Sequence, residues 1–238
     1  KSLYTRTSLL TTGDKKMKCE IEHAPVFSIL RVTLEQNESF RAESGAMVSM
    51  SSTIDLEAKG SGKGLLGSIK AAVGGESLFA SLYTAQGGPG EVVLAPPAPG
   101  DILQIDLNNE TLYAAGGAYL AGNKDLVLSS KGSFKSVISA SELFLSKITG
   151  TGTVFISAYG SILMKELGPD DVYVIDSGHL VAFTEHVQYK VSKASKGIFS
   201  SLASGEGLVS KFKGPGKVWY QTRNIQPLAG LIGTYIVK

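Results

Sequence analysis

The side chains best suited to acid–base or metal chemistry in this chain are His23, His179, His186 and Cys19. They show no H-x-H or H-E-x-x-H spacing, so a metal site would need residues far apart in the chain to converge. Glu185 precedes His186 on what reads as a strand or its entrance, and neighbouring strand residues point to opposite faces. We therefore predict no metal ion and no acid–base pair at these positions.

A glycine-rich segment is the nearest match to a cofactor motif. Gly62 to Gly67 reads G-x-G-x-x-G after an expected strand, as in dinucleotide-binding folds. The corresponding stretches at Gly132 and Gly197 lack the pattern, and no strand–helix alternation surrounds it, which favours a tight turn. A P-loop fails because Glu57 and Gly64 stand where that motif needs Gly and Ser or Thr. With no G-x-S-x-G motif either, we expect no cofactor, no catalytic residue and no enzymatic activity.

Three glutamates occupy corresponding places in the chain, each after a short amphipathic stretch and ahead of a glycine-bracketed turn. With threefold symmetry they would form a pseudo-symmetric acidic ring. Two interpretations stay open: the carboxylates cap helical segments or pair with lysines, or they hold a cation or ligand on the pseudo-axis. The three residues are Glu76, Glu142 and Glu206.

Three apolar stripes at helical spacing precede these glutamates and have lysines at their edges. Such faces suit docking of a second subunit, a protein partner or an anionic membrane surface. The alternative is that the stripes only pack on one another over one end of the fold. The candidate interaction surface consists of Leu65, Leu66, Ile69, Phe134, Val137, Ile138, Ile198, Phe199 and Leu202.

The elements that would position these residues follow from a repeat. Glycine-bracketed turns at Gly88–Gly90, Gly150–Gly152 and Gly214–Gly216 recur at intervals of 62 and 64 residues. Each turn is followed by one variable residue and a strand-like run. The runs are Val92–Ala95, Val154–Ser157 and Val218–Gln221.

One such unit has too little apolar surface to fold alone, so the copies must bury their apolar faces against one another. We predict an all-β fold of three tandem repeats in a pseudo-threefold arrangement, with a short helical insertion in each. The repeats span approximately 38–107, 110–176 and 177–223 within one domain, 17–238, and a C-terminal segment closes the chain. Residues 1–16 are expected to be a flexible arm or vector-derived.

Composition limits the function further. The net charge is +2, from 23 basic and 21 acidic residues, which argues against a general nucleic-acid binder. The single cysteine, Cys19, excludes an internal disulfide and favours a cytoplasmic location. The apolar C-terminal stretch, Pro227 to Val237, is about half the length that a membrane-spanning helix needs.

Three segments carry a family resemblance: Phe40–Met50, the glycine-rich Gly60–Gly67 and the run Gly74–Phe79. They resemble the mitochondrial-biogenesis family named for altered inheritance of mitochondria, over roughly Met17 to Arg223, and the chain looks like a prokaryotic member. The resemblance implies a fold similar to the tryptophan RNA-binding attenuation protein. It implies no established enzymatic activity and no catalytic residues.

Two classes of function remain. The repeat and the lack of a convergent polar cluster favour a non-enzymatic interaction or scaffold protein that forms a homo-oligomer. The alternative is a small-ligand or RNA-binding module by analogy of fold. RNA readers display aromatic platforms with basic residues, and here Trp219 and Tyr220 with Lys217 and Arg223 form one such cluster.

Overall fold

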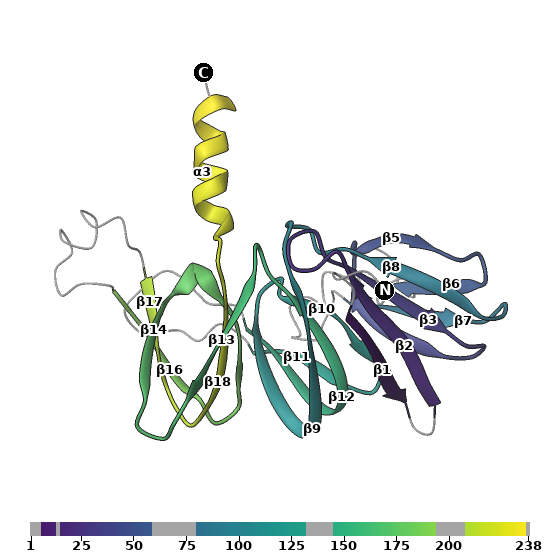
Figure 1. Ribbon diagram of the computed structural model, residues 1–238, viewed down its shortest axis with the longest axis horizontal. Coiled ribbons are helices and arrows are strands. Elements are labelled where there is room, and N and C mark those ends of the chain that lie inside the picture. Colours follow the sequence, from purple (N-terminus) through teal and green to yellow (C-terminus); the bar gives the residue numbers. More distant parts are fainter. Residues whose placement is uncertain (1–5, 13–14, 59–79, 132–144, 194–207, 237–238) are drawn as a thin grey trace, which may run out of the picture.

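The computed structural model describes residues 6–12, 15–58, 80–131, 145–193 and 208–236. Within these ranges the chain is built from antiparallel strands in three groups, which lie side by side along the long axis (Figure 1). The predicted all-β class is confirmed. No helix in the described ranges combines the length and the apolar character needed to cross a membrane.

The strands follow one another along the chain with short connections. The N-terminal group contains β1 (Arg6–Thr12), β2 (Lys15–Glu22), β3 (Ile29–Leu34), β4 (Ser39–Glu43), β5 (Met47–Met50), β6 (Ile54–Ala58), β7 (Ala80–Ala85) and β8 (Gly90–Leu94). The middle group contains β9 (Ile102–Ala115), β10 (Tyr119–Asn123), β11 (Val127–Lys131) and β12 (Leu145–Ser157). The C-terminal group contains β13 (Ile162–Leu167), β14 (Val172–Asp176), the 3-10 turn η1 (Ser177–His179), β15 (Leu180–Thr184), β16 (Gln188–Lys193), β17 (Leu208–Lys213) and β18 (Gly216–Gln221).

Alternating apolar residues explain why these segments form strands. In β3 the side chains of Leu30, Val32 and Leu34 are buried, and the residues between them are half-buried. In β4 Phe40 and Ala42 are buried in the same alternating way. Since successive strand residues point to opposite faces, this pattern places one face of each strand in the core.

The strands form three sheets. The N-terminal sheet has the order β1-β2-β3-β8-β5, and a separate sheet at the other end has the order β14-β17-β16. Between them, the largest sheet runs β13-β18-β15-β9-β12-β10-β4-β7-β6, and β11 pairs with β12 beside this path.

One order of strand pairing occurs three times. In the N-terminal group β8 pairs with β3 and β5, and β7 pairs with β4 and β6. In the C-terminal group β18 pairs with β13 and β15, and β17 pairs with β14 and β16. In the middle group the two halves of β9 correspond to β3 and β4, and the two halves of β12 correspond to β7 and β8. β10 corresponds to β5 and β11 to β6, since both pair with β12. The pseudo-threefold rotation and the repeat boundaries given above stay predictions.

The register of these pairings also recurs. Gly90 lies opposite Leu34, Gly152 opposite Leu107 and Gly216 opposite Leu167, and all three leucines are buried. A register shift then follows in each group, where β5, β10 and β15 pair with their neighbours. The shifts lie between Met47 and Ser49, between Tyr119 and Ala121, and between Leu180 and Ala182.

Each predicted glycine-bracketed turn precedes or interrupts a strand in the expected place. The runs after the turns lie in β8, β12 and β18, except for Ala95, which follows the end of β8. The middle turn differs from the others, because Gly150 and Gly152 flank a register shift inside the continuous strand β12. The chain therefore passes this point without reversing.

Adjacent groups are joined through single strand pairs. β4 pairs with β10 at what we call the first junction, and β9 pairs with β15 at the second junction. Three clusters of buried apolar residues fill the interior, and each draws mainly on one group. The N-terminal cluster also takes Ile102, Leu120 and Phe155 from the middle group, so the first junction is packed as well as hydrogen-bonded.

The two ends of the chain have regular secondary structure that the sequence did not predict. Residues 6–12 of the expected flexible arm form strand β1, which pairs with β2 from Arg6 opposite Ile21 to Thr12 opposite Lys15. The expected C-terminal closing segment is instead an α-helix, α3 (Ile225–Ile236), which projects away from the strands (Figure 1). None of its residues is buried.

Candidate functional site

The sequence-predicted site residues lie outside the described part of the chain. The nine apolar residues of the candidate interaction surface and the three glutamates fall within 59–79, 132–144 and 194–207. In each case the strands on either side of the stretch, β6 and β7, β11 and β12, or β16 and β17, pair with each other. The docking surface and the acidic ring therefore stay predictions.

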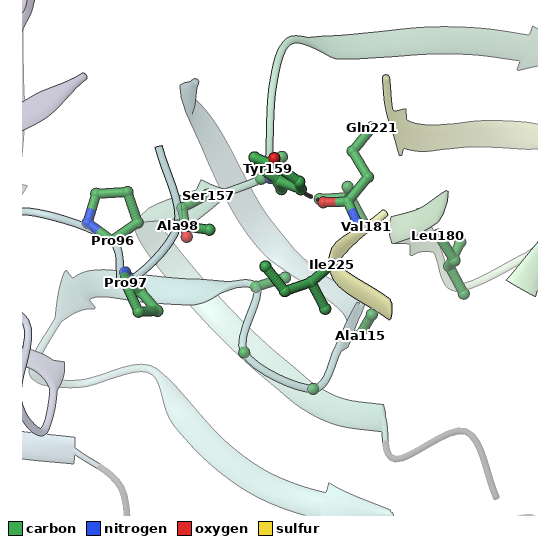
Figure 2. Close-up of a pocket in the computed structure, with 14 residues that line it drawn as sticks. Pro96, Pro97, Ala98, Ala115, Ser157, Tyr159, Leu180, Val181, Gln221 and Ile225 are labelled. Carbon is green, nitrogen blue, oxygen red and sulfur yellow. Dashed lines mark hydrogen bonds between the residues drawn. The ribbon is translucent and has the colours of Figure 1, made fainter. Parts of the chain in front are cut away.

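An apolar pocket of about 270 Å³ lies where the middle and C-terminal groups meet the loop before β9. Figure 2 shows Pro96 and Pro97 on one side of this pocket and Gln221 and Ile225 toward the other. The β9–β10 turn, Ala115 to Ala118, and the end of β12 complete the wall. None of its lining residues carries a charge, so the pocket suits a small, mainly apolar group.

Gln221 organises the polar edge of this apolar pocket. Its Oε1 accepts a hydrogen bond of 2.9 Å from the Tyr159 N–H (Figure 2). Its Nε2 donates one of 3.0 Å to the Gly178 carbonyl. The Gln221 carbonyl oxygen lies 2.7 Å from His179 Nδ1. Because a carbonyl oxygen can only accept a hydrogen bond, Nδ1 is the donor in this contact. These contacts use the amide for structure, and they hold β18 against the end of β12.

A larger cavity of about 760 Å³, which we call the acidic groove, lies at the second junction. One wall is β9 with Asp101 just before it, and the other is formed by β13, β18 and the β15–β16 turn. Its apolar surface comes from Leu103, Ile105, Leu107, Leu112, Ile162, Met164 and Trp219.

Five carboxylates and one lysine line the acidic groove, namely Asp101, Asp106, Glu110, Glu166, Glu185 and Lys217. Asp106 accepts hydrogen bonds from the Thr153 hydroxyl at 2.5 Å and from Gln104 Nε2 at 3.1 Å, which orient its carboxylate. The excess of acids makes the groove negative.

Glu185 and His186 both line the acidic groove, contrary to the expectation that they face apart. They lie in the β15–β16 turn and not on a strand, so the alternation of strand side chains does not apply to them. Among the described residues, no three His, Cys, Asp or Glu side chains are placed to hold a metal ion.

The aromatic cluster considered for RNA binding is not an exposed platform. Trp219 is only 7% exposed and belongs to the core of the middle group, and Tyr220 packs against Tyr173 with 6.0 Å between ring centroids. Base stacking needs an accessible ring face, which buried Trp219 does not offer.

Titratable groups with shifted pKa values lie mainly in the core. Burial raises the pKa of the Cys19 thiol, which disfavours the reactive thiolate. Burial also raises the pKa of Tyr119, whose hydroxyl donates to the Arg41 carbonyl at 3.3 Å, and that of Glu43. None of these three residues lines the apolar pocket or the acidic groove.

The fold and its cavities define a protein of linked antiparallel sheets, with an uncharged pocket and an acidic groove between strand groups. The chain belongs to the mitochondrial biogenesis AIM24 family, whose profile matches residues 19–223. It is 29% identical over 233 residues to an uncharacterized protein of Streptococcus pyogenes serotype M6, covering 94% of this chain and 92% of that protein. A crystal structure of a Streptococcus pyogenes protein is similar with a TM-score of 0.78 and 26% identity, over 98% of this chain and 100% of that one.

The sequence singles out Glu185, His186, Lys217 and Trp219 but gives no reason to group them with the other residues of the groove. The acids of the groove come from four separate elements, and no spacing in the chain connects them. The strand register is the one signal that relates a groove residue to a residue at the first junction. Trp219 and Phe155 are equivalent in it, because each is the third residue after a glycine that lies opposite a buried leucine. That equivalence requires the strand partners to be known.

Proposed function

We propose that this protein is a non-enzymatic interaction or scaffold protein that associates head to tail with further copies of itself. The association pairs strand β14 of one copy with strand β5 of the next. The observation that carries the proposal is that these two edge strands are the counterparts of strands that pair with each other at both internal junctions.

The two internal junctions have the same register. At the first, Ala42 lies opposite Ala121 and Arg41 opposite Gly122. At the second, Ala114 lies opposite Ala182, with Tyr113 and Phe183 as the next pair. In the recurring pairing order, β4 and β9 have β14 as their C-terminal counterpart, and β10 and β15 have β5 as their N-terminal counterpart.

Among the described strands, β5 pairs only with β8, and β14 pairs only with β17. All four residues of β5 are exposed, whereas its counterparts β10 and β15 are almost wholly buried. Val48 of β5 is 61% exposed, and Val172 and Val174 of β14 are 59% and 49% exposed. Unprotected apolar edges are templates for pairing with another chain.

The recurring register predicts which residues meet. Ile175 is the counterpart of Ala114, because the two lie opposite Ser210 and Ser146, which hold the same place in β17 and β12. Ser49 is the counterpart of Ala182, because the two lie opposite Val93 and Trp219, which hold the same place in β8 and β18. Transferring the internal junctions to the free edges therefore places Ile175 opposite Ser49. The next pair along the strands is then Val174 opposite Met50, which buries two exposed apolar side chains.

The β5–β14 contact would form between two copies of the chain, because the two strands lie at opposite ends of one copy (Figure 1). β5 belongs to one outer group and β14 to the other, with the middle group between them (Figure 1). Each copy thus offers a different surface at each end. Head-to-tail contacts of this kind give a closed ring if the rotation per subunit closes and a filament if it does not.

Light scattering after size-exclusion chromatography tests the association. At about 50 µM subunit we expect a mass above that of the monomer, which falls on dilution. Val174→Lys should return the protein to the monomer mass, because a charge enters the buried contact. Val127→Lys is the matched control, since Val127 is 63% exposed on β11, away from both edges. A monomer at this concentration would sink the proposal.

Cross-linking tests the register. In the double variant Met50→Cys with Val174→Cys, oxidation should give a ladder of linked copies on a non-reducing gel, since opposed strand residues are close enough for a disulfide. The pair Met50→Cys with Val127→Cys should stay unlinked. Equal ladders from both pairs would mean random collision and would contradict the predicted register.

The apolar pocket supports a second candidate, a small-ligand binding module. Its volume of about 270 Å³ and uncharged lining fit a small apolar molecule. Indole is a suitable probe, and saturable binding that Ala118→Trp abolishes would favour this function. Unchanged melting temperature at millimolar indole would count against it.

A cytoplasmic location belongs to the main proposal and is supported by the lone, buried cysteine.

A further inference from the structure

Among the residues that the structure describes, the two internal junctions differ in one respect: a strand fills the first, and a cavity lies at the second. At the first junction β2 pairs along the outer edge of β3, with Lys18 opposite Thr33 and Ile21 opposite Leu30. The alternate residues Met17, Cys19 and Ile21 of β2 are buried in the N-terminal core.

The acidic groove stands at the corresponding place of the second junction. By register, the first half of β9 is the counterpart of β3, since Leu107 faces Gly152 as Leu34 faces Gly90. Among the named strands, this half of β9, from Ile102 to Leu107, pairs only with β12. Within the described part of the chain, its other edge carries no strand corresponding to β2.

The residues around β2 also have counterparts in the groove. Ile102 and Phe155 share the N-terminal core with Met17, Cys19 and Ile21. Their counterparts by register, Ile162 and Trp219, line the acidic groove. The groove thus presents the apolar surface that β2 covers at the first junction.

We propose that the acidic groove binds an extended segment of a protein partner, which adds as a strand to the free edge of β9. The segment carries apolar side chains at alternate positions, which face Leu103, Ile162 and Met164. Its intervening side chains are basic, because the groove offers five carboxylates against one lysine. Strand addition of this kind takes affinity from main-chain hydrogen bonds and specificity from alternate side chains.

The charge distribution separates the two junctions. Glu166 and Glu185 in the groove correspond by register to Asp106 and Lys124 at the first junction, so the second junction has the more negative wall. The chain's own β2 carries Lys18 and Glu20 in a salt bridge of 2.9 Å on its outer face. A partner strand for the acidic groove therefore needs more positive charge than β2 has.

Binding of labelled peptides to the full chain tests the proposal by fluorescence anisotropy. The probe is an eight-residue peptide of alternating Lys and Val, and the control alternates Glu and Val. The Lys peptide should bind at least about tenfold more tightly at low salt, by complementary charge. A third peptide with Pro at two central Val positions should not bind, because Pro cannot donate to a strand ladder.

Two neighbouring residues of β13 supply matched variants. Met164 lines the groove and is 50% exposed, whereas Leu163 is 42% exposed and points to the other face. Met164→Arg should weaken binding of the Lys peptide about tenfold or more by filling the groove with like charge. Leu163→Arg should leave binding within about twofold, because its side chain lies outside the groove.

Hydrogen exchange places the bound segment. Saturating Lys peptide should slow exchange of amide protons in Ile102–Leu107 and leave β5 and β14 unchanged. Equal binding of the Lys and Glu peptides, equal loss in both arginine variants, or protection elsewhere would overturn the proposal. A lower self-associated mass in Met164→Arg would instead assign the groove to a second copy, while head-to-tail association through β5 and β14 is judged by its own variants.

Discussion

Arg31 joins three strands of the N-terminal sheet through its guanidinium. Its Nε donates to Glu22 Oε1 on β2 at 2.7 Å, and its Nη1 donates to Glu91 Oε1 on β8 at 2.9 Å. The two salt bridges extend to either side of β3, so they link β2 and β8, the two strands that flank β3 in this sheet.

Replacement of Arg31 by Met should destabilise the fold by about 1 kcal/mol, because a half-buried guanidinium with two carboxylate partners is lost. Urea unfolding measures this change. Lys18→Met is the control, since that salt bridge involves a lysine side chain with 50% exposure and should matter less. Equal effects of the two changes would show that the guanidinium does not link the strands.

The same pair predicts a pH dependence. The hydrogen bond from Arg31 holds the pKa of Glu22 below its ordinary value of 4.5. A lowered folded-state pKa gives stability that is present above the unfolded value and is lost as pH falls through the folded value. The difference in unfolding free energy between wild type and Glu22→Gln should therefore be constant near neutral pH and shrink below about 4.5. A difference independent of pH would contradict the pairing.

Cys19 should resist alkylation in the native protein. Its side chain is 0% exposed. The pKa of its thiol is raised, mainly by burial and to a smaller extent by the negative charges of Glu20 and Glu38. We expect iodoacetamide at pH 8 to label it only after unfolding in guanidinium, as measured by intact mass. Rapid labelling of the folded chain would mean that β2 opens frequently from β3.

Gly216 is one of the three glycines that lie opposite a buried leucine, and its close contacts can be tested by substitution. It has a φ of +143°, and an added Cβ would meet the side chains of Thr184 and Val187. Gly216→Ala should therefore lower the melting temperature more than Gly117→Ala, where φ is +80° but no atom lies within 4 Å. The backbone strain alone is worth about 1–3 kcal/mol at either site, so the excess reports the close contact. Thermal unfolding followed by circular dichroism measures both variants.

The strand content followed from local patterns. Alternation in Thr53–Ala58 marks the strand β6, and the glycine positions before Val92, Val154 and Val218 place β8, the end of β12 and β18. These signals are short-range, because a strand's two faces are set by its own alternating side chains. The helical conformation of the C-terminal stretch does not follow from its pattern, since an apolar run of its length suits a strand pair or a helix equally.

The sequence by itself determined the class of fold, the recurrence of its glycine-marked strands and the family to which the chain belongs. Only the tertiary structure decided which strand edges stay unpaired and where a cavity opens. Alternation tells which face of a strand is buried, but a strand's partner is set by hydrogen bonds to residues far along the chain. Met50 and Val174 on the free edges, and Met164 in the acidic groove, gain their significance from partners that no local pattern specifies.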